Sequence, residues 1–218
     1  VKRFAVISGG PGTGKTYTVA RILALLQALA GGRLRIGLAA PTGRAAARLQ
    51  ESIGRARQEM DSELAAPVPE QAGTLHRLLG LMPESGRFRH TRHNPLHLDL
   101  LIIDEASMVD VPLMAALVEA LPQSARLIML GDRDQLTSVE AGSLFGDICG
   151  TGEPAWSPAL SSRISRLTGI SLPGGSGSES MGDSIIILRT RYRFGEKGGI
   201  AALARLINAG DQAVLAAF

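Results

Sequence analysis

The sequence has few aromatic residues and a single cysteine. Aromatic side chains make up 4% of its 218 residues, which leaves little material for the base-stacking platforms of many single-strand-binding proteins. Cys149 has no second cysteine to pair with, so no disulfide can form within the chain. No apolar run approaches the roughly 18 residues that a membrane-spanning helix needs. We therefore expect a cytoplasmic protein with no membrane segment.

The remaining composition is ordinary for a globular protein and slightly basic. Hydrophobic residues make up 45% and charged residues 20%, and 23 Lys and Arg against 20 Asp and Glu give a net charge of +3. That charge permits a nucleic-acid partner without requiring one. The length suits one α/β domain. The chain begins in strand-like sequence and residues 211–218 resemble the middle of an element, so we expect a fragment of a longer protein.

Short apolar segments alternate with segments of helical periodicity. Strands are predicted at 4–8, 34–40, 98–103, 126–130 and 184–188, and helices at 15–30, 44–57, 110–121 and 199–208. Several strands are apolar on both faces, which is typical of a parallel sheet covered by helices on each side. We predict an α/β fold of this kind, with irregular loops at 59–73 and 173–182. Sites in such sheets lie beyond the carboxyl ends of the strands.

A glycine-rich segment separates the first predicted strand from the first predicted helix. Its residues, Gly9, Gly10, Pro11, Gly12, Thr13, Gly14, Lys15 and Thr16, match the pattern G-x-x-x-x-G-K-S/T. Glycines let successive backbone N–H groups point at phosphate oxygens, and the helix N-terminus favours an anion. Lys15 is expected to reach the β- and γ-phosphates, and the Thr16 hydroxyl to bind Mg²⁺. The segment predicts a phosphate loop, with ATP and Mg²⁺ as its ligands.

Two carboxylates, Asp104 and Glu105, directly follow the most apolar strand. Placing both charges there is costly without a cation, and a phosphate-bound Mg²⁺ would supply one. Asp104 is expected to hold the metal through its water shell, and Glu105 to orient and polarise the attacking water. A solvated strand end that caps the next helix is the plainer alternative. The phosphate loop in the same chain favours the catalytic interpretation.

Several segments together resemble motifs of superfamily 1 helicases. They are residues 9–16, 40–46, 74–79, 104–110 and 130–142, with 191–195 similar to helicase motif IV. The resemblance is strongest to the RecD family, the alpha subunits of RecBCD helicase–nucleases (exodeoxyribonuclease V), and residues 94–99 and 165–169 also fit that family. It covers nearly the whole chain and implies one RecA-like ATPase domain over residues 1–218. The family's second motor domain and N-terminal domain would be absent from this chain.

The resemblance also implies roles for residues that the pattern alone leaves open. Gln135 would sense the γ-phosphate and the attacking water, although an isolated glutamine in a turn is usually solvated. Arg193 would be an arginine finger, an effect of roughly 10³–10⁵ in rate where it has been dissected. Arg191 is the second choice for that role. A surface arginine paired with a neighbouring acid such as Glu196 is the alternative for Arg193.

Two further segments carry candidate DNA contacts. Thr42, Gly43 and Arg44 begin a predicted helix, where N–H groups and a hydroxyl suit a DNA phosphate. By resemblance Thr74 and His76 form a second backbone contact, although His76 could equally brace its own loop. Contacts of this sort hold a strand without reading its bases. We expect single-stranded DNA to bind with little sequence preference.

Three histidines in a basic segment have spacing that suggests zinc. His90, His93 and His97 lie among arginines that would repel a cation, and the only cysteine is distant in sequence. A structural zinc site usually needs four ligands that include cysteine. We therefore interpret this segment as a basic loop that faces DNA, a partner subunit or solvent. Trp156 is expected to be a packing residue.

The leading hypothesis is an ATP-dependent DNA helicase or translocase. The resemblance of the sequence to the RecD family implies action on single-stranded DNA in double-strand-break repair, 5′ to 3′ travel, and partners of the RecB and RecC type. A second hypothesis is a nucleotide-gated assembly module of a repair complex with little turnover. A third, a kinase-like P-loop enzyme, is disfavoured by the segment around Gln135. The fragment itself is expected to be monomeric and largely inactive, because half of the catalytic site would be missing.

Overall fold

A central parallel sheet organises the molecule. The computed structural model describes residues 3–135, 144–150, 155–172, 181–190 and 192. The strand order is β3 (Gly73–Thr74), β2 (Ile36–Ala40), β6 (Leu100–Ile103), β7 (Arg126–Gly131), β1 (Phe4–Gly9) and β8 (Ile185–Leu188). Every neighbouring pair runs parallel. The carboxyl ends of all six strands therefore meet at one edge.

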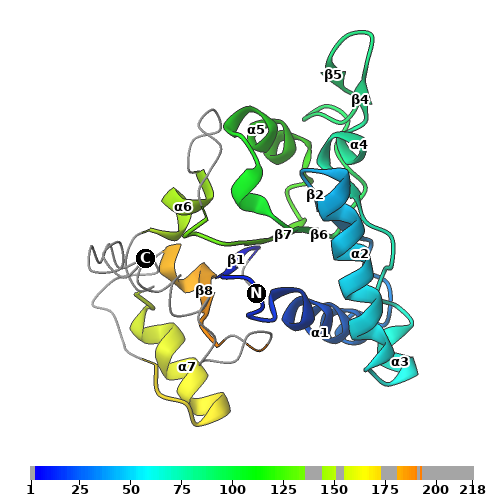
Figure 1. Cartoon of the computed structure of the whole chain (residues 1–218). Helices are drawn as coiled ribbons and strands as arrows, with labels where there is room; N and C mark the ends of the chain where they lie inside the picture. The colour runs from blue at the N-terminus through cyan, green and yellow to red at the C-terminus, as the bar shows by residue number, and fades with distance from the viewer. Residues whose placement is uncertain (1–2, 136–143, 151–154, 173–180, 191, 193–218) are drawn as a thin grey trace, which may run out of the picture.

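Two long helices cover one face of the sheet. They are α1 (Lys15–Leu29) and α2 (Gly43–Gln58), with the short α3 (Ser62–Ala65) packed against both (Figure 1). Leu23 of α1 and Leu49 and Ile53 of α2 are fully buried. They pack in one apolar cluster with side chains from five strands. Apolar residues at helical spacing on α1 and α2 thus produce one half of the core.

The opposite face is covered by shorter elements. They are α4 (Leu75–Leu79), the 3₁₀ turn η1 (Ala106–Met108), α5 (Val111–Ala120) and α6 (Leu144–Cys149). Leu101 and Ile103 of β6 point into this second cluster, whereas Leu100 and Ile102 point into the first. All four are fully buried, a gain of about 1.5–3 kcal/mol for each side chain. β6 is therefore anchored on both faces, and it fixes the position of Asp104 at its end.

The predicted fold class is confirmed, and the element boundaries differ by one or two residues. The predicted strand at 34–40 begins later, at Ile36, and the helix predicted at 110–121 spans Val111–Ala120. Asp110 is its N-cap, because the side chain accepts from the backbone N–H of Leu113 at 2.7 Å. The helix predicted at 199–208 and most of the loop predicted at 173–182 lie outside the described residues.

Several short elements were not predicted from the sequence. They are α3, β3, α4, the antiparallel hairpin β4 (Leu81–Met82) and β5 (Arg87–Phe88), α6, α7 (Pro158–Thr168) and the 3₁₀ turn η2 (Met181–Ser184). The loop expected at 59–73 thus contains one helical turn. Trp156 is half-buried and donates to the carbonyl of Ile185 at 3.4 Å. Within the described residues, no helix combines the length and the apolar character that crossing a membrane requires.

Gly131, at the end of β7, offers a test of the packing. A Cβ added there would lie 2.8–3.1 Å from three ring atoms of Phe145, and Phe145 is buried. We expect Gly131→Ala to lower the free energy of unfolding by about 1–3 kcal/mol through overpacking. The matched control is Gly54→Ala inside α2, where an added Cβ meets nothing within 4 Å. It should stabilise by about 0.5–1 kcal/mol in denaturant titrations; equal effects of the two variants would contradict this packing.

Candidate nucleotide and nucleic-acid site

The glycine-rich segment forms a tight loop between β1 and α1. Gly12 and Gly14 have φ values of 78° and 82°, a left-handed conformation that glycine adopts without penalty. A Cβ at Gly9 would lie 2.6 Å from Thr13 Oγ1 and 2.9 Å from the Leu188 carbonyl oxygen. The loop therefore requires glycine at these three positions, for two different reasons.

Lys15 and Thr16 occupy the first turn of α1, where the loop closes. The Lys15 ammonium donates to the carbonyl oxygens of Gly9 at 2.5 Å and Gly10 at 3.3 Å, so it lies within the loop. The first turn of α1 holds no acidic residue, and no side chain caps it. Its N–H groups and the positive end of the helix dipole are therefore available to an anion.

Asp104 lies directly beyond β6 in a shielded position. Its backbone N–H donates to the Ala39 carbonyl at 2.9 Å, and its carboxylate accepts from the Glu105 N–H at 2.9 Å. Burial raises the pKa of Asp104 above its usual range, and the negative charge of Glu105 adds to this rise. The hydrogen bond from the Glu105 N–H and the positive charge of Lys15 lower the pKa and so oppose it. A shielded carboxylate in this position is suited to a cation.

Glu105 adopts an unusual backbone conformation. Its φ is 52°, the only positive φ of a non-glycine residue among the described residues. A left-handed conformation at such a residue costs of order 1–3 kcal/mol and is found most often at functional sites. Here it turns the chain sharply between β6 and η1. The turn brings both Asp104 and Glu105 to the wall of one cavity.

The burial of Asp104 predicts opposite effects on stability and on metal binding. A raised pKa in the folded state means that ionisation of Asp104 opposes folding at neutral pH. We expect Asp104→Asn to raise the free energy of unfolding by about 0.5–2 kcal/mol at pH 7 without metal. The gain should shrink as the pH falls, since the wild-type carboxyl is then protonated in both states. The same substitution removes a proposed Mg²⁺ ligand, so Mg²⁺ with nucleotide should stabilise the variant less than the wild type. Thermal melts across pH, with and without Mg²⁺ and nucleotide, check both effects. Destabilisation of the variant at pH 7 without metal would contradict the expected gain in stability.

Gln135 completes the cavity from the end of β7. A turn after β7, closed by Gln135 N–H and the Asp132 carbonyl at 3.2 Å, carries both residues. The Ser107 hydroxyl donates to Gln135 Oε1 at 2.7 Å. The cavity, of about 870 Å³, is lined by Pro11 to Thr16, Asp104, Glu105, Asp132 and Gln135, together with residues of α1 and α2. Lys15, Thr16, Asp104, Glu105 and Gln135 thus share one pocket, while Gly9 and Gly10 shape its loop.

The structure adds residues to this pocket that the sequence did not suggest. Tyr17 lines it and lies beneath Arg21, whose guanidinium carbon is 3.6 Å from the ring centroid. Arg48 and Arg55 of α2 also line it. The sequence could not indicate these two arginines, because they reach the pocket only through the way α2 packs beside the phosphate loop. The backbone N–H of Tyr192 donates to Gly12 at 2.9 Å.

The two candidate arginine fingers lie outside the described residues. Arg191 and Arg193 flank Tyr192 in the sequence, and only Tyr192 is described. Their assignment therefore stays a prediction from the resemblance of this segment to a helicase motif. Of the predicted segment at 130–142, residues 136–142 likewise lie outside the described residues.

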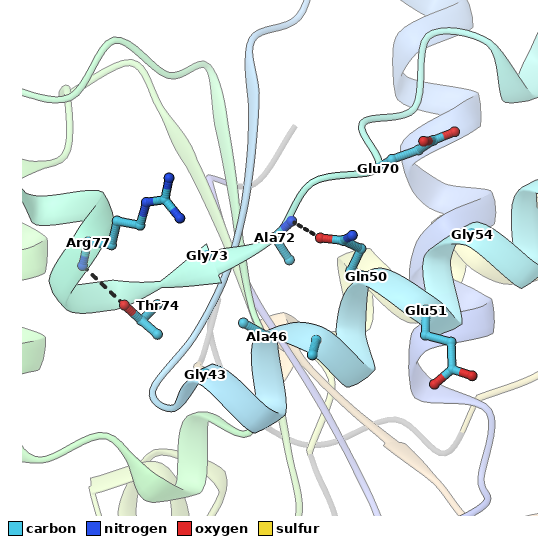
Figure 2. Close-up of a pocket in the computed structure, with 11 residues that line it drawn as sticks. Gly43, Ala46, Gln50, Glu51, Gly54, Glu70, Ala72, Gly73, Thr74 and Arg77 are labelled. Carbon is cyan, nitrogen blue, oxygen red and sulfur yellow. Dashed lines mark hydrogen bonds between the residues drawn. The ribbon is translucent and has the colours of Figure 1, made fainter.

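The candidate DNA contacts gather at the same edge of the sheet. β2 and β3 are adjacent, with Ala40 opposite Thr74, so the residues after both strands lie close together. A cleft of about 540 Å³ opens between α2 and the β3–α4 segment, with Gly43, Thr74 and Arg77 on its walls (Figure 2). The cleft and the nucleotide pocket share one residue, Glu51 of α2.

Hydroxyl groups cap both helices at this cleft. Thr42 Oγ1 accepts from the Ala45 N–H and Thr74 Oγ1 from the Arg77 N–H, each at 3.2 Å. Figure 2 shows the second bond and the bond from Ala72 N–H to Gln50 Oε1. Each capping hydroxyl keeps its own hydrogen as a donor for an acceptor such as a phosphate oxygen.

His76 and the basic segment connect to the β4–β5 hairpin. The His76 ring is exposed and lies 6.0 Å from the Phe88 ring, which it meets at 46°. His90 Nδ1 lies 3.2 Å from the Asn94 carbonyl oxygen. No group of three or more possible metal ligands occurs in the part of the chain that the structure describes. The His76 ring of α4 thus contacts the hairpin through Phe88.

The sheet, the phosphate loop and the acidic turn define a P-loop nucleotide-binding domain. A family profile described as AAA domain matches residues 1–141. The chain belongs to the AAA domain family, whose P-loop implies binding of a nucleoside triphosphate.

Comparison with individual proteins narrows this further. The chain is 41% identical over 213 residues to the RecBCD enzyme subunit RecD of Haemophilus influenzae. This alignment covers 95% of the chain and 33% of that protein. It is 45% identical over 222 residues to RecD of Mycolicibacterium smegmatis, covering 97% and 35% respectively. The predicted resemblance is confirmed: the chain is homologous to part of RecD and spans about a third of the length of these relatives.

A solved structure agrees with the fold. The crystal structure of Pif1 helicase from Candida albicans superposes with a TM-score of 0.51 and 17% identity, over 94% of this chain and 40% of that one. At this identity the match supports the fold alone. It agrees with the predicted α/β fold built on a parallel sheet.

Proposed function

We propose that this chain is the ATP-binding motor domain of a DNA helicase that moves along single-stranded DNA. The observation that carries the proposal is the single pocket shared by Lys15, Thr16, Asp104, Glu105 and Gln135. These five residues come from three separate segments, after β1, β6 and β7. Such convergence of a phosphate loop, two carboxylates and an amide supports hydrolysis of a triphosphate rather than binding alone.

Four residues of the pocket have roles in the hydrolysis step of this proposal. Lys15 offsets negative charge on the β- and γ-phosphates, and Glu105 takes a proton from the attacking water. The water oxygen bonds to the γ-phosphorus as the bond to the β-γ bridging oxygen breaks, and ADP leaves with that electron pair. Thr16 and Asp104 offer the hydroxyl and carboxylate oxygens that Mg²⁺ prefers. When bound there, Mg²⁺ would offset charge on the leaving phosphates.

The position of α2 supports a link between nucleotide and DNA. Gly43 and Ala46 near its start line the cleft at β2 and β3, while Arg48 and Arg55 line the nucleotide pocket. A shift of α2 against the sheet would change both cavities together. Contacts from Thr42, Gly43, Arg44, Thr74 and His76 to a DNA backbone would therefore respond to the bound nucleotide.

The relatives suggest the biological setting. Both are RecD subunits of the RecBCD enzyme, which supports a role in double-strand-break repair with partners of the RecB and RecC type. The proposal includes 5′ to 3′ travel, a second motor domain beyond the present chain, and Arg193 as a finger that completes the site. Its test is ATP turnover by the complete protein with and without single-stranded DNA. Turnover that DNA leaves unchanged would contradict the motor function.

The chain on its own should bind nucleotide weakly and turn it over negligibly. In this proposal the motor site lies between two RecA-like domains, of which this chain would supply one. Titration with a fluorescent ATP analogue and a phosphate-release assay would measure both properties. Steady-state hydrolysis by the isolated chain that Lys15→Ala abolishes would show that one domain is sufficient.

A further inference from the structure

Ser107 is a buried polar residue next to the acidic turn, and the proposed mechanism does not use it. Its side chain is 6% exposed, and η1, which carries it, packs against β7 and α6. A buried hydroxyl normally needs a hydrogen-bond partner. That partner is Gln135 Oε1, at 2.7 Å, 28 residues further along the chain.

In the structure the bond engages the oxygen end of the Gln135 amide. Oε1 is engaged by the Ser107 hydroxyl, so the amide nitrogen and its two hydrogens point away from Ser107. Gln135 is otherwise exposed, and within the described residues no acceptor binds its Nε2. Without such a bond, an exposed glutamine side chain populates several rotamers. Only the orientation seen here offers donors to an anionic γ-phosphate oxygen.

We propose that Ser107 is a positioning residue for Gln135, which it holds ready to donate to the γ-phosphate. This inference rests on the proposed ATPase function and deepens it. Ser107 does not touch the nucleotide in this account. It acts by holding Oε1 in place while Nε2 donates to a phosphate oxygen, which removes other positions that the exposed side chain would otherwise adopt.

The same bond ties the sensor to the acidic turn. Ser107 lies two residues after Glu105, and the Glu105 carbonyl accepts from the Met108 N–H at 3.0 Å. The left-handed φ of Glu105 fixes the direction in which η1 leaves β6. A displacement of Asp104 or Glu105 would therefore move the hydroxyl that holds Gln135. The bond thus links the segment that carries Asp104 and Glu105 directly to Gln135.

A double-mutant cycle on the complete protein tests this inference. DNA-stimulated ATP turnover would be measured for Ser107→Ala, Gln135→Ala and the double variant, with kcat and KM determined separately. We expect Ser107→Ala to lower kcat about tenfold, with a smaller change in KM for ATP, because the loss arises when the γ-phosphate develops charge. In the Gln135→Ala background the same substitution should lower kcat by less than about twofold, since the partner is gone.

Two further variants separate positioning from packing. Ser107→Thr keeps a hydroxyl at this position and should recover most of the lost kcat, while Ser162→Ala, on the exposed surface of α7, should leave turnover and the melting temperature unchanged. A tenfold loss that persists in the Gln135→Ala background would overturn the inference, as would a loss that follows the melting temperature alone. If Ser107→Ala does not fold, Ser107→Cys replaces the hydroxyl by a weakly donating thiol and carries the same comparison. It should lower kcat in the wild-type background and not in the Gln135→Ala background, and an equal fall in both backgrounds would overturn the inference.

The cycle also distinguishes this inference from the proposed function. If Gln135→Ala leaves turnover unchanged while Glu105→Gln removes it, the positioning role of Ser107 fails and the ATPase proposal stands. If neither substitution affects turnover, the ATPase proposal itself fails.

Discussion

Replacing Lys15 by alanine is expected to lower DNA-stimulated ATP turnover of the complete protein by about 10²–10³-fold. The ammonium is the only cation in the closed loop, where it lies 2.5 Å from the Gly9 carbonyl oxygen. Preorganised donors aimed at developing charge account for losses of that size when one is removed. Affinity for the triphosphate should fall as well, since Lys15 would contact the β- and γ-phosphates in the ground state. Turnover and nucleotide binding would be measured side by side.

Two comparison variants make this result specific. Lys15→Arg keeps the charge but brings a larger, planar group into the tight loop, and we expect it to remain impaired. Arg166→Ala removes an exposed cation from α7, away from the pocket, and should behave as wild type. Full turnover by Lys15→Ala would exclude this loop as the phosphate site.

Glu105→Gln should separate binding from hydrolysis. The amide keeps the size of the carboxylate but cannot take a proton from water, so we expect kcat to fall by about 10²–10⁴-fold. Nucleotide affinity should stay within a few-fold of wild type, because Glu105 is assigned to the water and not to the phosphates. Single-turnover kinetics together with equilibrium binding would check both expectations. Glu119→Gln, an exposed position on α5, is the matched control.

The same variant distinguishes the motor from the assembly hypothesis. A nucleotide-gated assembly module would assemble with its partners as well in Glu105→Gln as in wild type, and the wild type would show little turnover. A motor would lose DNA-stimulated turnover while its partners still bind. Rapid hydrolysis by Glu105→Gln would remove the proposed water-activating role from this residue.

The sequence predicted the elements that are determined locally. β6 could be predicted because its four residues are apolar without interruption, and the phosphate loop because glycines separate a strand from a helix. Asp104 and Glu105 could be placed near the loop because parallel strands end at one edge. Short elements such as β3 and the β4–β5 hairpin could not be predicted. Each has two residues per strand, and tertiary contacts rather than propensity decide whether such strands form.

The finer geometry of the site depended on contacts between distant segments. The bond from Ser107 to Gln135 joins two turns 28 residues apart, and no spacing in the sequence indicates it. The raised pKa of Asp104 arises mainly from burial. The apolar sequence of β6 suggests that the pKa is raised, but it does not indicate by how much. The walls supplied by Arg48 and Arg55 depend on how α2 is rotated about its axis. The proposed role of Arg193 rests on resemblance alone.

The shared wall formed by α2 has a mechanical consequence. An α-helix of 16 residues behaves as a stiff rod about 24 Å long, so it tilts or rolls as a unit instead of bending between its two cavities. Because the nucleotide pocket and the cleft proposed for DNA lie against different sides of this rod, a roll that narrows one would widen the other. The nucleotide pocket would then close on ATP while the cleft opens, and the cleft would close on a DNA strand while the pocket opens. Stepwise movement in one direction requires such an alternation.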